Sequence, residues 1–238
     1  MRRLSLRSTL LTVLALNLFI PHQAASQSQD TTVLGGLDVV AIVGAGALFL
    51  GPHSLWEVDS VECVPCDPSE VPAFERWTIA PVRKVPDTIS DFLLLGIGIA
   101  SWVDMANEGA AGRAGIVSSA ESFLISAGIT EVLKKLAGRK RPYLYTPEGA
   151  PFAGSASAQE SWPSGHSAAA ASLAASYWLT RDRISSDAGN DAHAWALATG
   201  AVGVAALRVA AAKHFPSDVL SGLAIGILTA GLVHTVKF

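Results

Sequence analysis

The sequence predicts an all-α protein, a helical bundle of about six helices that is embedded in a membrane. Half of the 238 residues are hydrophobic, only 16% are charged, and the mean hydropathy is +0.38. Apolar runs of helical length alternate with short polar or proline-rich connections. Alanine and glycine are abundant and aromatic residues are scarce, which favours helices packed closely through small side chains.

The N-terminus is typical of an export signal. In residues 1–26, basic residues precede the apolar run from Leu10 to Ile20, and small residues at 24–26 offer a cleavage site. An uncleaved leader is the alternative, since the run is too short to cross a bilayer alone. Residues 27–238 are assigned to one domain, in which the glycine-rich stretch 33–51 is either a weak membrane helix or a helix packed against the bundle.

A polar, proline-rich connection follows at residues 53–88, where the density of proline argues against a long regular element. It contains Cys63 and Cys66, which are expected to form a local disulfide in an exported protein. A zinc site would need two more ligands, and His53 and Asp67 are near in sequence without a recognised metal-binding spacing.

The remaining helices are predicted from five apolar segments. These are Ile89 to Ala106, Ala114 to Leu136, Ser164 to Thr180, 193–212 and 217–236. In the second segment, polar residues recur every four positions from Ser122 to Lys134 and therefore share one helix face. This polar stripe either leads to a functional site or packs against a neighbouring helix.

The most informative stretch joins the last two segments. Pro216 suits the first turn of a helix but cannot continue one from its N-terminal side. Arg208 is therefore placed on the last turn of one helix, His214 in the connection, and Asp218 in the first turn of the next. From there the carboxylate can reach back to one ring nitrogen of His214 and turn the other outward, which prepares an imidazole as a nucleophile.

Two further blocks accompany this stretch: Lys-x6-Arg-Pro at 134–142 and Pro-Ser-Gly-His at 163–166. The three blocks together resemble the tripartite signature of the type 2 phosphatidic acid phosphatase (PAP2) superfamily, which also includes soluble bacterial acid phosphatases and vanadium haloperoxidases. The family's third block is Ser-Arg-x5-His-x3-Asp, and this chain departs from the pattern only at Leu207, where the family usually has Ser. That departure removes one hydroxyl donor beside the phosphate.

The resemblance implies phosphoryl transfer through a phosphohistidine. His214 is the expected nucleophile, Asp218 orients it, and His166 is the general acid and then the general base. The expected phosphate-binding residues supply positive charge, donors at a helix N-terminus, or room for close approach. They are Lys134, Arg141, Ser164, Gly165 and Arg208. No metal and no cofactor is expected, because the cations neutralise the charge that magnesium neutralises elsewhere.

The other charged residues near the motifs, and two further histidines, are given no role in the predicted site. Lys135, Arg139 and Lys140 are expected to be solvated loop charges or contacts to anionic headgroups. His193 and His234 are interpreted as bystanders, because no partner pattern accompanies them.

The predicted function is hydrolysis of lipid-linked phosphate monoesters or diphosphates at the periplasmic face of a bacterial inner membrane, with a phosphorylated lipid as partner. The orientation follows from basic residues at the far end of the helices, which are expected in the cytoplasm. They are Arg113, Arg181, Arg183 and Lys237. A soluble periplasmic acid phosphatase is the main alternative, and a vanadate-dependent haloperoxidase and an inactive membrane scaffold are lesser ones. The net charge of −3 argues against nucleic acid.

Overall fold

The computed structural model describes residues 61–185, 189 and 191–238, and between residues 35 and 47 it describes only short pieces. The predicted leader, residues 1–26, lies outside the described residues, and the segment 33–51 is described only in part.

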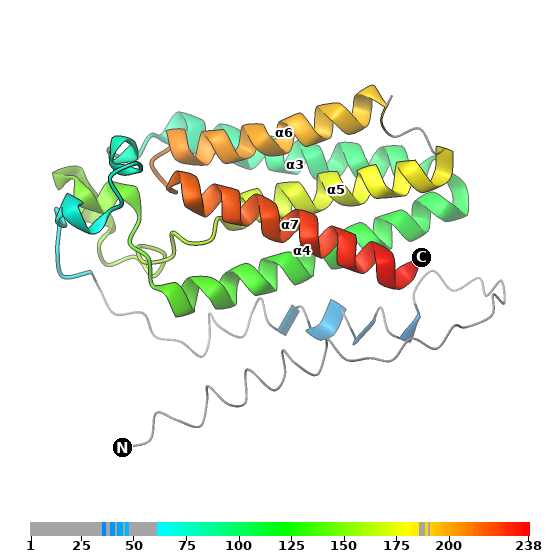
Figure 1. Cartoon of the computed structure of the whole chain (residues 1–238), viewed down its shortest axis with the longest axis horizontal. Coiled ribbons are helices and arrows are strands. Elements are labelled where there is room, and N and C mark those ends of the chain that lie inside the picture. Colours follow the sequence, from blue (N-terminus) through cyan, green and yellow to red (C-terminus); the bar gives the residue numbers. More distant parts are fainter. Residues whose placement is uncertain are drawn as a thin grey trace, which may run out of the picture. The chain divides into compact units, whose positions relative to one another are not determined.

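The described ranges contain helices and no β-strand, so the predicted all-α fold is confirmed. The long helices are α3 (Lys84–Ala106), α4 (Gly109–Ala137), α5 (Gly165–Ser185), α6 (Ala192–Ala210) and α7 (Pro216–Lys237). Short 3₁₀ turns lie in the connections: η1 (Pro68–Glu70), η2 (Arg76–Thr78), η3 (Pro142–Tyr145) and η4 (Pro147–Phe152). Helix α5 packs against each of the other four long helices, which form a bundle around it (Figure 1).

Two helix ends differ from the sequence-based expectation. Helix α3 begins at Lys84 rather than Ile89, because Pro86 falls in the first turn, where a missing N–H costs no helical hydrogen bond. Helix α5 continues to Ser185, beyond Thr180, where the predicted apolar segment ends. There Arg181 forms ion pairs with Glu108 and with Asp191, the residue that caps α6, so its charge is compensated within the bundle.

Close approach of α5 and α7 depends on two glycines spaced one turn apart. A Cβ atom at Gly222 would lie 2.4 Å from the carbonyl oxygen of Ser164, and one at Gly226 would lie 2.2 Å from that of Ala168. Backbone atoms cannot move aside as a flexible side chain can. Small residues therefore set the separation of the two helices that carry the second and third motifs.

Replacing Gly226 by alanine is expected to lower the free energy of unfolding by about 1–3 kcal/mol, because the added methyl overpacks the helix contact. The measurement is the unfolding midpoint in detergent. Gly231→Ala on the same helix is the matched control, since nothing lies within 4 Å of a Cβ at that position. Equal midpoints for the two variants would contradict the close contact between α5 and α7.

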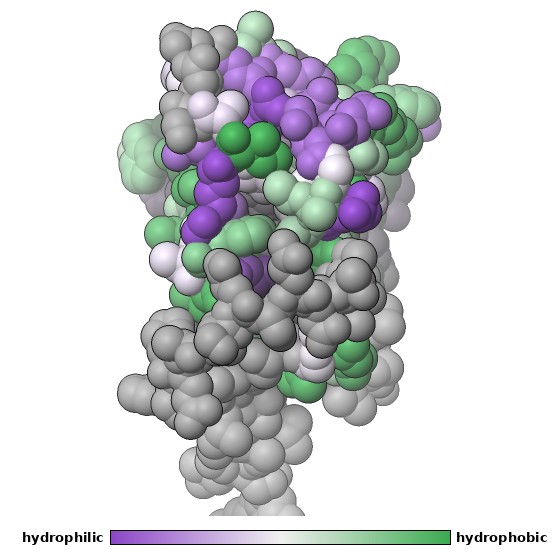
Figure 2. Space-filling view, turned by 90° about the vertical axis from the view of Figure 1, so that its right-hand side faces the viewer, coloured by the Kyte–Doolittle hydropathy of each residue, from purple (hydrophilic) through white to green (hydrophobic). Residues whose placement is uncertain are grey.

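The bundle has the surface of a membrane protein. Helices α3, α6 and α7, and a segment from Gly109 to Tyr145 that includes α4, are long and apolar enough to cross a membrane. Large apolar side chains such as Phe92 and Leu228 are exposed along the helices. Figure 2 views the end of the bundle at which α5 ends and α6 begins, and it shows hydrophilic residues gathered over part of that end with hydrophobic residues at its margins.

Candidate active site

The three motifs converge at the opposite end of the bundle, on the left in Figure 1. Lys134 lies in the last turn of α4, Arg208 in the last turn of α6, and His166 in the first turn of α5. His214 lies in the connection to α7 and Asp218 in the first turn of that helix, as predicted.

Hydrogen bonds to backbone carbonyls join the motifs directly. The amide of Ser164 donates to the carbonyl of Asp218 at 3.0 Å, which ties the second motif to the third. The guanidinium of Arg141 donates to the carbonyls of Ser157 at 2.8 Å and Lys213 at 3.3 Å, which ties the first motif to the third. Segments far apart in sequence thus form one site.

His214 is buried, and its Nδ1 lies 2.6 Å from the carbonyl oxygen of Ser161. A carbonyl only accepts, so Nδ1 carries the proton and Nε2 carries the lone pair. Burial lowers the pKa of His214 well below its ordinary value, and the positive charges of Arg141 and Arg208 lower it further. The imidazole is therefore neutral, the form that a nucleophile requires.

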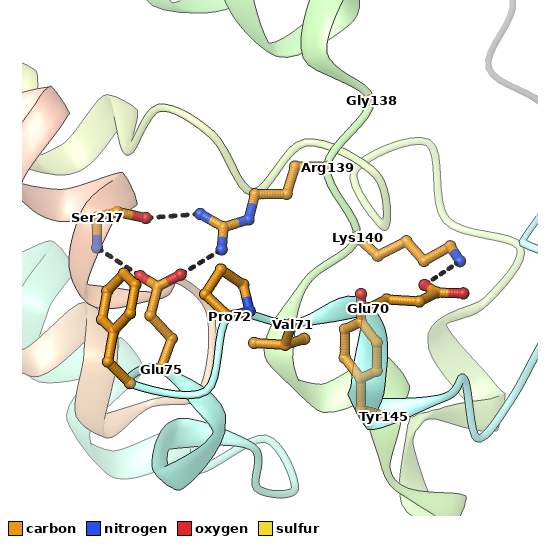
Figure 3. A pocket seen from close by; sticks show the side chains of 10 residues that line it. Glu70, Val71, Pro72, Glu75, Gly138, Arg139, Lys140, Tyr145 and Ser217 are labelled. Carbon is orange, nitrogen blue, oxygen red and sulfur yellow. Dashed lines mark hydrogen bonds and ion pairs between the residues drawn. The ribbon is translucent and has the colours of Figure 1, made fainter.

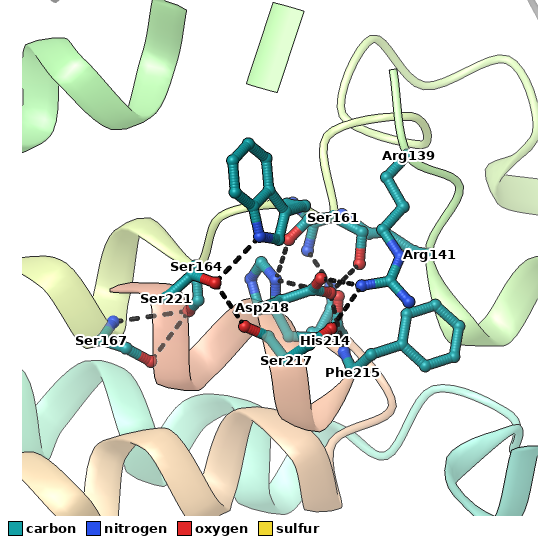
Figure 4. A network of polar contacts seen from close by, with 12 residues as sticks. Arg139, Arg141, Ser161, Ser164, Ser167, His214, Phe215, Ser217, Asp218 and Ser221 are labelled. Atoms are coloured by element: carbon teal, nitrogen blue, oxygen red, sulfur yellow. Dashed lines mark hydrogen bonds and ion pairs between the residues drawn. The ribbon is translucent and has the colours of Figure 1, made fainter. Parts of the chain in front are cut away.

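The predicted hydrogen bond between Asp218 and His214 is not formed. The nearest carboxylate oxygen of Asp218 lies 3.9 Å from Nδ1, beyond hydrogen-bond distance, because the Ser161 carbonyl occupies that position. Asp218 instead accepts from the Ser161 hydroxyl at 2.6 Å and from the Phe215 amide at 2.8 Å (Figure 4). Asp218 therefore contacts His214 indirectly, through Ser161 and through the peptide N–H of Phe215, the residue after His214.

The cations of the three motifs are largely buried. Arg208 donates through Nη1 to Asp87 at 2.6 Å and to Ser90 at 3.2 Å. Its Nε is buried and has no hydrogen-bond partner in the part of the chain that is described. An unsatisfied guanidinium N–H is costly unless a ligand accepts from it, so Arg208 is suited to an oxyanion. Lys134 pairs with Glu131 one turn earlier on α4.

Two carboxylates of α3 enter the same site, and sequence reasoning gave them no role. Asp91 lies 2.9 Å from Nε2 of His166 and 3.7 Å from Arg208, while Asp87 pairs with both Arg208 and Lys213. The signal that could have found them is their spacing of four on the first turns of an otherwise apolar helix, which places both on one face.

The second motif fits the expectation in part. A Cβ atom at Gly165 would lie 3.2 Å from Nζ of Lys134, so glycine permits the approach of that cation. The amide of Ser164 is already bonded to Asp218, contrary to the expectation that it faces an anion. The hydroxyl of Ser164 accepts from Ser167 at 3.0 Å and keeps its own proton for donation.

The polar stripe on α4 serves helix packing. The hydroxyls of Ser122, Ser126 and Thr130 donate to carbonyls of their own helix, and all three residues are buried. The stripe ends at the second motif: a Cβ atom at Gly165 would lie 3.2 Å from Nζ of Lys134 and 3.7 Å from the hydroxyl oxygen of Thr130, so its last two members reach the site.

The expectation of solvated charges is wrong for Lys135 and Arg139, whereas Lys140 lies in a partly exposed ion pair. Lys135 forms a buried ion pair with Glu160, and Lys140 pairs with Glu70 at 2.8 Å. Arg139 pairs with two buried carboxylates. The carboxylates that neutralise these cations are remote in sequence, so local composition gave no sign of them.

Cys63 and Cys66 are joined in a disulfide, as predicted. The amide of Cys66 donates to the carbonyl of Leu144 at 3.0 Å, which fixes the disulfide loop against the first motif's loop. Asp67, a ligand in the zinc alternative, caps η1 through the amide of Ser69, and His53 lies outside the described residues.

Comparison with known proteins agrees with this arrangement. The profile of the PAP2 superfamily matches residues 115–238, just over half of the chain. A lipid A 1-phosphatase from Rhizobium johnstonii is 34% identical over 109 residues, a match that covers 44% of this chain and 41% of that protein. The matched stretch is thus less than half the length of that relative, and no solved structure matches the chain. The profile match contains all three motif blocks, and we conclude that the chain belongs to the PAP2 superfamily.

Proposed function

We propose that this protein is a phosphatase that hydrolyses lipid-linked phosphate monoesters or diphosphates through a phosphohistidine on His214. The observation that carries the proposal is the buried, neutral imidazole of His214. Its Nδ1 donates to a carbonyl, and the charges of buried Arg141 and Arg208 help to lower its pKa. A cation-lined site neutralises the phosphate dianion, and the imidazole supplies the nucleophile.

The proposed reaction has two steps. Nε2 of His214 attacks phosphorus as the bond to the leaving oxygen breaks, and His166 gives its proton to that oxygen. Burial and the charge of Arg208 lower the pKa of His166 to about 4 without substrate, so the ring takes up this proton as the phosphate anion binds beside it. Water then attacks the phosphohistidine, neutral His166 takes a proton from the water, and the P–N bond breaks to release phosphate. Arg141, Arg208 and Lys134 stabilise the charge on the equatorial oxygens in both steps.

A lipid substrate is supported by two observations. Helices α3, α6 and α7 and the segment that includes α4, all of which contribute residues to the site, are long and apolar enough to cross a membrane, so the site lies at the end of a bundle suited to the bilayer. The matched relative from Rhizobium johnstonii is named for dephosphorylating lipid A, a phosphorylated membrane lipid. Phosphate release from a panel of lipid phosphates and diphosphates, lipid A included, tests the proposal when a small soluble ester is run beside it. Comparable kcat/KM on the soluble ester, with release of active protein without detergent, would favour the soluble acid phosphatase instead.

The periplasmic orientation of the site is supported by the disulfide. Disulfides persist in oxidising compartments, and this one packs against the loop of the first motif. The motif end of the bundle would therefore face the periplasm.

After mild reduction of intact cells, a membrane-impermeant maleimide is expected to label Cys63, which is half-buried at the motif end. Phe238→Cys in a cysteine-free background is the control, because residue 238 is 45% exposed at the C-terminus of α7, at the other end of the bundle. That variant should be protected until the membrane is permeabilised. Labelling of residue 238 but not of Cys63 in intact cells would reverse the orientation.

A further inference from the structure

The pocket beside the motif end contains an arginine, Arg139, that occupies one of the six unspecified positions of the first motif. A cavity of about 470 Å³ opens between the segment that carries η1 and the loop after α4 (Figure 3). Arg139 lies in its wall with 24% of its side chain exposed. Its guanidinium crosses from this pocket to the buried polar network of the active site (Figure 4).

Arg139 makes four contacts that fix its position. Nη2 donates to Glu75 at 2.6 Å, and Nη1 donates to the hydroxyl of Ser217 at 2.7 Å and to the carboxylate of Asp218. The guanidinium also stacks over the ring of Phe215, 4.3 Å from its centroid. Every partner but Glu75 lies in or just before the first turn of α7, so Arg139 fixes that turn.

Glu75 holds the other side of the arginine. Its carboxylate is 1% exposed, and besides Arg139 it accepts from the amide of Ser217 at 2.8 Å. Burial acts to raise the pKa of Glu75, but the hydrogen bonds from Ser217 and Arg139 outweigh it, and the pKa lies below its ordinary value. Glu75 precedes the region matched by the superfamily profile, so no family motif assigns it a role.

A continuous chain of contacts leads from this ion pair to the nucleophile. Asp218 joins Arg139 through one carboxylate oxygen and the hydroxyl of Ser161 through the other. The carbonyl of the same Ser161 accepts from Nδ1 of His214. Without Arg139, one oxygen of a fully buried carboxylate loses its charged partner, which is costly and displaces the groups that share that carboxylate.

We propose that Arg139 is a positioning residue for His214: a guanidinium held by Glu75 that fixes Asp218 and, through Ser161, the direction of the imidazole. The role rests on the proposed function, since it concerns the same reaction. Arg139 is not expected to touch the substrate, so its loss should lower kcat and leave KM nearly unchanged.

The test compares Arg139→Ala with Lys140→Ala in full-length protein. Arg139→Ala is expected to lower kcat on the order of 10²-fold, the effect of misplacing a reacting group by about 1 Å. Added guanidinium should restore part of the activity, because the open pocket admits it, and Arg139→Lys should retain more activity than the alanine variant. Lys140→Ala is the matched control: it breaks an ion pair in the same pocket with Glu70, which has no contact with Asp218. Its kcat should stay within a few-fold of wild type.

A second readout does not depend on turnover. The Nδ1 proton of His214 should give a low-field proton resonance, assigned by its loss in His214→Ala, that is shifted or lost in Arg139→Ala and kept in Lys140→Ala. If the resonance and kcat of Arg139→Ala match those of Lys140→Ala, the positioning role is wrong. If wild-type protein releases no phosphate from any substrate, the proposed function fails, and the resonance alone still decides whether Arg139 positions the ring.

Discussion

Replacing His214 by alanine is expected to reduce kcat on the order of 10⁶-fold, the size of effect seen when other covalent enzymes lose their nucleophile. The expectation follows from the state of the ring, which is neutral and has Nδ1 bonded to the Ser161 carbonyl, so that Nε2 is left for attack on phosphorus. The cations that are proposed to bind phosphate are untouched by this change. Vanadate or phosphate binding should therefore persist while turnover is lost, and the measurement is phosphate release per folded molecule.

The control for this variant is His234→Ala, which removes a histidine from the last turns of α7, at the other end of the bundle. It should retain wild-type turnover and unfold at nearly the same temperature. Phosphate release by His214→Ala at more than a small fraction of the wild-type rate would reject the nucleophile assignment, provided that denaturation before assay abolishes that release.

The local chemistry of the third motif explains why the sequence predicted its placement. Pro216 can occupy the first turn of a helix but not its interior, which fixed the start of α7 and put His214 in the connection. Arg208 then fell on the last turn of α6. These are rules that act over a few residues, and a single sequence contains everything they need.

The parts of the site that the sequence did not predict depend on distant contacts. Glu75 and Arg139 are 64 positions apart, and Asp91 and His166 are 75 apart, so no spacing pattern links them. The partner of His214 Nδ1 was also not predictable from the sequence. It is the Ser161 carbonyl rather than Asp218, and residue 161 lies near the ring because α5 packs on α7. Motif spacing therefore predicted which motif side chains lie together at one end of the bundle, while the tertiary fold supplies the carboxylates and the carbonyl around them.

Replacing His166 by alanine is expected to have an effect that depends on the leaving group. With an alkyl phosphate the first step should slow by about 10²–10⁴-fold, because the departing alkoxide receives no proton. A nitrophenolate departs without a proton, so with a nitrophenyl ester His214 should still become phosphorylated. The second step needs His166 as the base that activates water, and the phosphohistidine should then accumulate. Rapid mixing should accordingly show a burst of nitrophenolate that approaches one equivalent per site, followed by slow turnover.

The contacts of His166 allow it to act as the proton donor and acceptor that this experiment tests. Nε2 lies 2.9 Å from Asp91, which is on α3 and more than half exposed, so the carboxylate can leave when a phosphate dianion enters among the same cations. His193→Ala is the control, since that exposed residue lies at the start of α6, at the far end of the bundle. Equal losses of kcat on alkyl and nitrophenyl esters, without a burst, would show that His166 binds substrate rather than transferring protons. Acid-labile phosphate that is retained on His166→Ala and absent from His214→Ala would assign His214 as the nucleophile and His166 as the base of the second step.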